Sequence, residues 1–248
     1  MSAGDDLDQQ YLEFVADTVD VFGRFPHLEP LRHFIFRELL VQRRSIGLKD
    51  EMKYVMQRAW QSTKASPAKE QSDVLIWLES SREVIVDALL PIYQELISRR
   101  VNVQLVSYGG PSNLPSSAMQ FQHRPNVFPP AWAKPAWEHL CRIYQRLQHD
   151  GLYRSFAHTC AVAEGFFSTA QRTLDVVRPK VVLCAATNFI GGAAVTMTSR
   201  WKVSRPILLQ HGMTQAFYTP LISEYMVTWG SSSNDTLANL GVPINRLL

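Results

Sequence analysis

Apolar positions in the first sixty residues recur at helical spacing. Residues 11–22 carry an apolar side chain every three or four positions, and Gly23 ends that series. A second apolar series occupies residues 30–47, where the interleaved arginines form either a solvated face or a contact surface for phosphate or anionic lipid. A third, short helix is expected at residues 52–60. The N-terminal part of the chain is therefore predicted to be helical.

A polar stretch separates these helices from the rest of the chain. Residues 61–72 lack a regular apolar pattern and include Ser66-Pro67, which is typical of a linker. We therefore expect a helical N-terminal region at residues 1–65 and a separate domain at residues 73–248.

After this stretch the pattern changes to continuous apolar runs of strand length. Residues 74–78 are such a run, residues 102–106 are expected to form a second strand, and an amphipathic helix ending near Arg99 lies between them. Strand, helix and strand in this order predict a parallel βαβ unit. Further strands are expected at residues 181–185, 207–209 and 224–229, and further helices at residues 137–149, 152–177, 191–201 and 235–240. The sequence thus predicts an α/β fold, in which a Rossmann-like parallel sheet is flanked by helices.

Two segments depart from this alternation. Residues 108–135 are rich in proline and predict a long loop, a feature that is usually functional or mobile in a compact domain. Residues 242–248 resemble the start of one more strand, after a helix that residues 230–234 are expected to cap. From that last strand we expect the chain to be the N-terminal piece of a longer polypeptide.

Polar residues follow the predicted strands where each strand ends. His211 follows the strand at residues 207–209, and other polar residues follow the strands at 74–78, 102–106 and 181–185. In open α/β sheets, ligands bind beyond the carboxyl ends of the strands, where helix N-termini point. His211 is either a ligand-facing residue or a turn histidine, and one serine after the first strand is expected to cap the next helix. The other candidates at these strand ends are Ser80, Ser81, Tyr108, Gly109, Thr187 and Asn188.

Composition narrows the possible functions. The chain has 248 residues and a formal net charge of +3, which suits anionic ligands or a membrane surface but is too small for a nucleic-acid footprint. Cys141, Cys160 and Cys184 are widely separated, as in reduced core residues of a cytoplasmic protein. No apolar run reaches the roughly 18 residues of a membrane span, so membrane contact, on the inner face, would be peripheral. The sequence lacks a dinucleotide fingerprint, a P-loop and a metal-binding acidic pair, so we expect neither cofactor nor metal.

The final quarter of the chain resembles a known family. The motif Pro206-Ile-Leu-Leu-Gln-His-Gly212, a strand ending in Trp229-Gly230, a helix and then Gly241-Val-Pro243 are similar to the N-terminal, acceptor-side domain of GT-B glycosyltransferases. The nearest resemblance is to bacterial surface and capsule polysaccharide transferases, followed by CDP-glycerol glycerophosphotransferases. The order of elements from residue 74 fits the same domain, whereas residues 1–60 have no counterpart in it.

The resemblance implies a division of labour between two domains. A second, C-terminal domain, which this sequence does not contain, would bind a nucleotide-sugar donor, and this chain would bind a saccharide or lipid-linked acceptor. His211 would then be the base that accepts the acceptor proton, with Glu79 as a rival base. Gln210, Thr214 and Gln215 would hydrogen-bond acceptor hydroxyl groups, and the amide of Gly212 would face a phosphate.

Two other classes of function stay open. One is an enzyme similar to the sugar-nucleotide 2-epimerases, which would need more carboxylates in its cleft than this sequence offers. The other is a non-catalytic Rossmann-like binding or scaffold module, in which the N-terminal helices dock a partner or a second copy of the chain and His211 is structural. A nucleotide-binding domain downstream would support transfer, and a downstream region unrelated to nucleotide binding would favour the scaffold.

Overall fold

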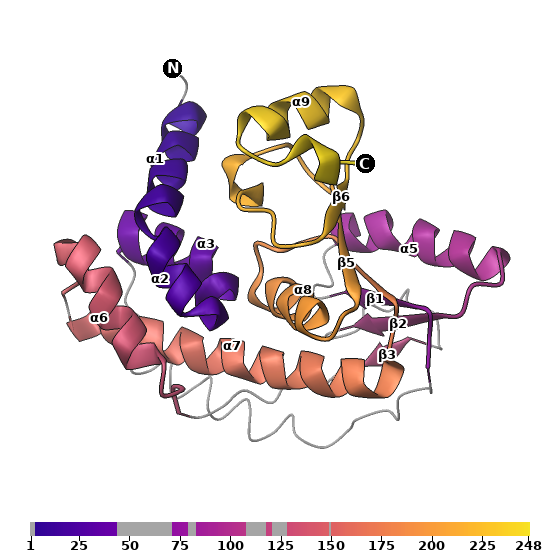
Figure 1. Ribbon diagram of the computed structural model, residues 1–248, viewed down its shortest axis with the longest axis horizontal. Coiled ribbons are helices and arrows are strands. Elements are labelled where there is room, and N and C mark those ends of the chain that lie inside the picture. Colours follow the sequence, from indigo (N-terminus) through magenta and orange to yellow (C-terminus); the bar gives the residue numbers. More distant parts are fainter. Residues whose placement is uncertain (1–2, 44–70, 79–82, 108–117, 121–127, 149) are drawn as a thin grey trace. The chain divides into compact units, whose positions relative to one another are not determined.

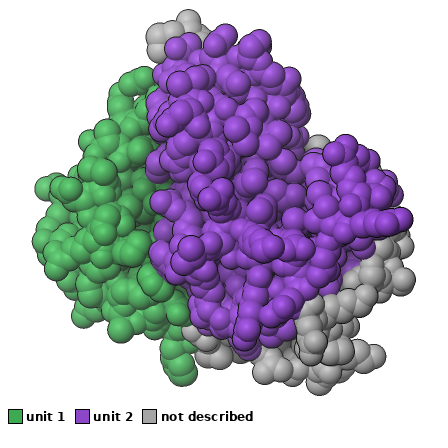
Figure 2. Space-filling model, turned by 45° about the vertical axis from the view of Figure 1, so that its right-hand side comes forward, with its two compact units in different colours: residues 1–63, 124–166 green, residues 64–123, 167–248 purple. Residues whose placement is uncertain are grey.

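A computed structural model of the protein describes residues 3–43, 71–78, 83–107, 118–120, 128–148 and 150–248 (Figure 1). The predicted helix at residues 52–60 and nearly all of the predicted linker lie outside these ranges. By their internal contacts the residues form two compact units, one of residues 1–63 and 124–166 and one of residues 64–123 and 167–248 (Figure 2). Contacts thus group residues 124–166 with the N-terminal helices, while the domain limits given above stay a prediction.

The second unit contains a six-stranded sheet in which every pair of neighbours is parallel. The strands lie in the order β3-β2-β1-β4-β5-β6, so the direction of strand addition reverses between β1 and β4. Their bounds are β1 Val74–Leu78, β2 Val103–Ser107, β3 Met119–Gln120, β4 Val181–Cys184, β5 Arg205–Leu209 and β6 Tyr225–Val227. The predicted α/β fold with a Rossmann-like parallel sheet is confirmed. Strand β3 was not predicted, since it is two residues long and lies within the proline-rich segment.

Helices cover both faces of this sheet. Ile76 of β1 pairs with Leu105 of β2 and with Leu183 of β4, and this row packs against α5, Glu83–Ser98, through residues such as Leu89. On the opposite face the thiol of Cys184 lies 3.4 Å from the hydroxyl of Thr196, which belongs to α8. Strands that are buried on both faces have apolar side chains pointing both ways, and this explains the continuous apolar runs.

Helix α8, Ile190–Trp201, begins with small residues that are buried. Gly191, Gly192, Ala193 and Ala194 are all inaccessible or nearly so, and the helix contacts β1, β4 and β5. These small buried residues allow the helix to lie close to the sheet. The aromatic ring of Trp201 at the end of α8 stacks on Phe167 of α7, Asp150–Val177, at 5.4 Å.

The first unit is a helical cluster. It contains α1 Ala3–Asp17, α2 Val19–Arg24, η1 Pro26–Leu31, α3 Arg32–Phe34, η2 Ile35–Val41, α6 Ala133–Ile143, η3 Gln145–Leu147 and the first part of α7. Its aromatic core includes Phe14, whose ring lies 5.6 Å from that of Phe36 and 6.2 Å from that of Tyr144. The Tyr144 hydroxyl donates a 3.0 Å hydrogen bond to Asp17. Residues far apart in the sequence thus share one core.

The second predicted helix is less regular than expected. Residues 26–31 form a 3₁₀-helix that contains Pro30, and residues 35–41 form a π-helix, with the amide of Gln42 bonded to the carbonyl of Arg37. Proline lacks an amide proton and cannot join an α-helical ladder, which accounts for the irregular start. Apolar spacing alone cannot separate these helix types.

The C-terminal segment corrects two predictions. Residues 231–234 do not cap a helix but begin one, because α9 spans Ser231–Asn239 and Gly230 precedes it. Residues 242–248 do not form a regular strand: Ile244–Arg246 is a 3₁₀ turn, η5, and only Leu247 bridges to Met226 of β6. Pro243 supplies no amide proton, and its carbonyl accepts the amide of Arg246 at 2.9 Å, so this segment turns where a strand would extend.

Candidate functional site

A cavity of about 150 Å³ lies beyond the carboxyl ends of β4 and β5. Its lining residues follow these two strands or belong to the loop before β6. They are Thr187, Asn188, His211, Gly212, Met213, Gln215, Phe217 and Tyr218. The structure therefore brings together Thr187, Asn188, His211, Gly212 and Gln215, which the sequence had singled out from two separate segments.

Gln210 fixes the turn that carries His211. Its side-chain oxygen accepts the amide of Trp229 at 2.9 Å, and its side-chain nitrogen donates to the carbonyl of Gly212 at 2.9 Å. The Gln210 carbonyl in turn accepts the indole N–H of Trp229 at 3.0 Å, and its amide donates to Val227 at 2.9 Å. Gln210 is only 6% exposed, and its hydrogen bonds are made to protein groups. These bonds connect the end of β5 to the end of β6.

His211 is half-buried in the wall of this cavity. Burial lowers the pKa of its imidazole below the usual 6.5, and the carbonyls of Ala185 and Leu209 oppose that effect only in part. Its Nδ1 atom is buried and does not reach hydrogen-bonding geometry with any described group. The lowered pKa favours the neutral form of the ring, which can accept a proton or a hydrogen bond. Because Nδ1 is buried, a ligand in the cavity would have to meet the other ring nitrogen, Nε2.

The loop after His211 supplies residues that the sequence analysis missed. Its 3₁₀ turn η4, Ala216–Tyr218, is anchored by the fully buried Ala216 and presents Phe217 and Tyr218 to the cavity. Burial raises the pKa of Tyr218, so its phenol stays protonated and can act as a hydrogen-bond donor. The adjacent aromatic residues Phe217 and Tyr218, beside a stretch rich in hydroxyl groups, were the sequence feature that could have indicated them. Thr214 belongs to the same loop but does not line the cavity.

Several predicted site residues cannot be placed. Glu79, Ser80, Ser81, Tyr108 and Gly109 all lie outside the described residues, so their assignment stays a prediction. Both Glu79 and His211 therefore stay candidates for the role of base.

The described residues show neither a cluster of metal ligands nor a membrane-spanning helix. In the described ranges, no three His, Cys, Asp or Glu side chains gather as metal ligands would. Cys141, Cys160 and Cys184 are buried and unbridged. No helix in the part of the chain that the structure describes is both long and apolar enough to cross a bilayer.

Comparison with known proteins assigns no family. No protein-family model matches the chain, and no curated protein matches it either. What the fold and the cavity define is a class, a Rossmann-like α/β unit with a histidine-bearing pocket at the carboxyl edge of its sheet. Function must be argued from that pocket, because Rossmann-like sheets host many unrelated activities.

Proposed function

We propose that this chain is the acceptor-binding half of a GT-B-type glycosyltransferase or glycerophosphotransferase, with His211 as the general base. The observation that carries the proposal is the position of His211 in the lining of a cavity at the carboxyl edge of the sheet, beside the side chains of Thr187 and Asn188. That edge is where α/β proteins of this topology bind ligands. The proposal also rests on the resemblance of residues 181–248 to the acceptor domain, which stays a prediction.

The chemistry needs a hydroxyl group held beside the ring. In glycosyl transfer the acceptor oxygen bonds to the anomeric carbon of the donor while the bond from that carbon to the nucleoside diphosphate breaks. The acceptor proton passes to the imidazole of His211, which must be neutral to receive it. The lowered pKa of His211 provides the neutral form at the cost of some basicity.

The pocket lining suits a polyhydroxyl ligand. Thr187, Asn188 and Gln215 offer neutral donors and acceptors, and the ring of Phe217 offers an apolar face. At about 150 Å³ the cavity is smaller than the roughly 300–1,000 Å³ that enclose a drug-sized ligand. It would hold one hydroxyl-bearing group of an acceptor, and the rest of the acceptor would extend outside.

Gln210 takes a different part in this proposal. Both ends of its side chain are already bonded to protein groups, so it acts as a positioning residue for His211. The hydrogen bonds to the acceptor that we expected of Gln210 fall to Thr187, Asn188 and Gln215 instead.

The proposal also assigns partners and a setting. A nucleotide-activated donor would bind to a second domain, and the acceptor would be a saccharide or lipid-linked saccharide of a bacterial surface polysaccharide. The reaction would take place in the cytoplasm, at most in peripheral contact with the inner membrane face. Among the described residues that line the cavity there is no carboxylate, whereas a chemistry of the 2-epimerase kind needs several.

The test is His211→Ala in the complete polypeptide, assayed for transfer from a panel of nucleotide sugars and CDP-glycerol to saccharide acceptors. We expect turnover to fall by about 10²–10⁴-fold with the fold retained, because a positioned base contributes that much. His139→Ala, a histidine of α6 outside this pocket, is the matched control. Turnover of His211→Ala near that of the unaltered protein would favour a non-catalytic binding module.

A further inference from the structure

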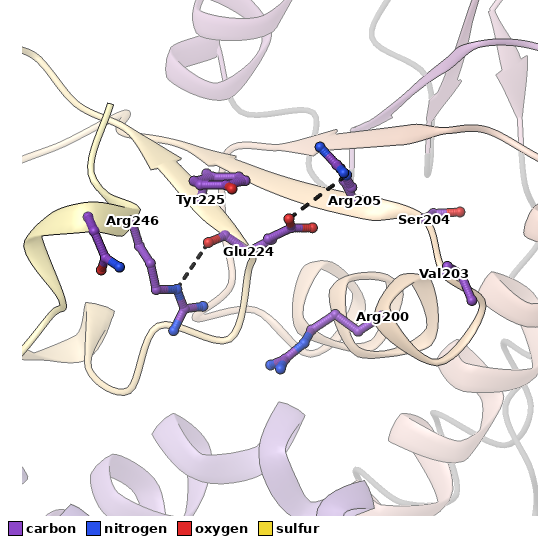
Figure 3. A pocket seen from close by; sticks show the side chains of 8 residues that line it. Arg200, Val203, Ser204, Arg205, Glu224, Tyr225 and Arg246 are labelled. Atoms are coloured by element: carbon purple, nitrogen blue, oxygen red, sulfur yellow. Dashed lines mark hydrogen bonds and ion pairs between the residues drawn. The ribbon is translucent and has the colours of Figure 1, made fainter.

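A second and larger cavity lies at the opposite, amino-terminal edge of the same sheet. It measures about 500 Å³ and is formed by the end of α8, the starts of β5 and β6, and η5. Figure 3 shows the side chains that line it: Arg200, Val203, Ser204, Arg205, Glu224, Tyr225, Asn245 and Arg246. Three separate elements each contribute one arginine, so the cluster is not the solvated face of a single helix.

The positive charge in this cavity is not balanced by carboxylates. Arg205 lies 3.9 Å from the carboxylate of Glu224. Arg200 and Arg246 have no such partner among the described residues, and they bond to backbone carbonyls instead. Figure 3 shows these two guanidinium groups reaching toward one another on the side of Glu224 away from Arg205. The lining therefore holds three guanidinium groups and one carboxylate.

Backbone carbonyls hold the two unpaired arginines in place. Arg200 donates to the carbonyl of Ile222 at 3.1 Å, while Arg246 donates to Glu224 at 3.0 Å and to Leu221 at 2.9 Å, and also to Ser223. The guanidinium groups are thus ordered before any ligand arrives. Each guanidinium has five N–H donors, so donors of both groups remain for another acceptor.

Two like charges held close together are unfavourable without a counter-ion. Burial and then the charge of Arg200 lower the pKa of Arg246, although a guanidinium stays protonated in any case. Because neither arginine can discharge itself, the repulsion is relieved most directly by a bound anion. Planar guanidinium forks match the oxygens of a phosphate group better than an ammonium does.

We propose that the cavity of Arg200, Arg205 and Arg246 binds a phosphate-bearing anion, either a soluble phosphate ester or a phosphate headgroup of lipid. Strand β5 connects the two sites, with Arg205 at its start and His211 two residues beyond its end. At about 3.3 Å per residue they lie about 20 Å apart, too far to share one small ligand. The anion site is therefore independent of the proposed acceptor site.

The experiment measures binding of pyrophosphate to the full chain by calorimetry, and sedimentation of the chain with phosphatidylcholine vesicles that contain phosphatidic acid. Arg200→Gln should weaken binding about tenfold, since it removes a charge-assisted contact. Glu224→Gln should tighten binding about fivefold, because it removes a repelling charge near the anion. Opposite shifts from two neighbouring substitutions are not expected of a merely structural cluster.

Controls separate this site from others. Arg99→Gln makes the same charge change at an exposed arginine of the α5 end, paired with Glu95, and should leave binding unchanged. His211→Ala should also leave binding unchanged, whatever it does to transfer. Arg246 is left intact because its bonds hold residues 221–224.

The two binding measurements distinguish a soluble ligand from a lipid. Pyrophosphate binding without vesicle sedimentation assigns a soluble phosphate ester, and sedimentation that Arg200→Gln weakens assigns a lipid headgroup. The proposal is overturned by an absence of saturable binding to either probe, or by binding that neither Arg200→Gln nor Glu224→Gln alters.

Discussion

At the scale of single residues, adjacent positions in the Gln210-His211-Gly212 motif have different tasks. Gln210 is buried and bonded on both sides to the protein, whereas His211 is half-buried and lines a cavity. From the sequence alone both are polar residues at a strand end, and both are equally plausible ligands. Only their hydrogen-bond partners tell the positioning residue from the candidate base.

This distinction makes a prediction for Gln210. Gln210→Ala removes the two side-chain hydrogen bonds to Trp229 and Gly212 and should lower the free energy of unfolding by about 2 kcal/mol, at about 1 kcal/mol per bond. Urea denaturation followed by circular dichroism measures the change. Gln215→Ala, at an exposed position of the same loop, should stay within about 0.5 kcal/mol of the unaltered protein. Equal stabilities for the two variants would show that the side chain of Gln210 does not anchor this turn.

At the scale of elements, helix α8 shows how small residues set the depth of the site. Ala193 and Ala194 are fully buried, and Thr196 reaches the thiol of Cys184 in the neighbouring strand. The helix therefore lies close to the sheet, and the Thr187-Asn188 turn that precedes it lies beside the cavity. Larger side chains at Ala193 or Ala194 would move α8 away from the sheet and shift the Thr187-Asn188 side of the cavity.

Ala194→Leu tests the close packing of α8. Inserting a larger side chain at a fully buried position should lower the free energy of unfolding by about 1–3 kcal/mol, because a close-packed interior does not expand freely. Met197→Leu, a volume-conserving change at a half-buried position of the same helix, should cost less than about 1.5 kcal/mol. Thermal unfolding of the two variants side by side gives the comparison. An unaltered melting temperature for Ala194→Leu would show that the helix does not lie close to the sheet.

Elements with a strong period could be predicted from the sequence, and the others could not. The runs at β1 and β4 are apolar because these strands are buried on both faces. Strand β3 is too short to have a period. The residues after Pro243 look like a strand, but Arg246 bonds to the carbonyls of residues 221–224, a long-range contact that no local pattern records.

At the scale of the whole sheet-bearing unit, two pockets lie at opposite edges of one parallel sheet. The carboxyl edge holds the neutral, hydrogen-bonding pocket of His211, and the amino edge holds the cationic pocket of Arg200 and Arg246. In a parallel sheet all strands begin at one edge and end at the other, so different loops form the two pockets. The charge of one pocket is therefore independent of the charge of the other. We expect different ligands at the two edges.

Predictability of the site follows from the same geometry. The rule that ligands bind at carboxyl strand ends located Thr187, Asn188 and His211 in advance. Tyr218 was not predicted as a site residue because its position depends on the 3₁₀ turn at residues 216–218. Arg200 and Arg246 were not predicted because they lie at the end of a helix and in a turn. Sequence patterns specify which residues end strands, but not how a long loop folds back.

The central claim is that His211 presents a neutral imidazole to a bound acceptor. Nuclear magnetic resonance of the chain with labelled histidine measures this directly, by a pH titration without and with glycerol and a panel of saccharides. We predict a pKa for His211 below 6.5, because burial disfavours the charged ring, and a shift of its resonance on saccharide or glycerol binding. A pKa at or above 6.5, together with a resonance that no hydroxyl-bearing ligand moves, would contradict the account.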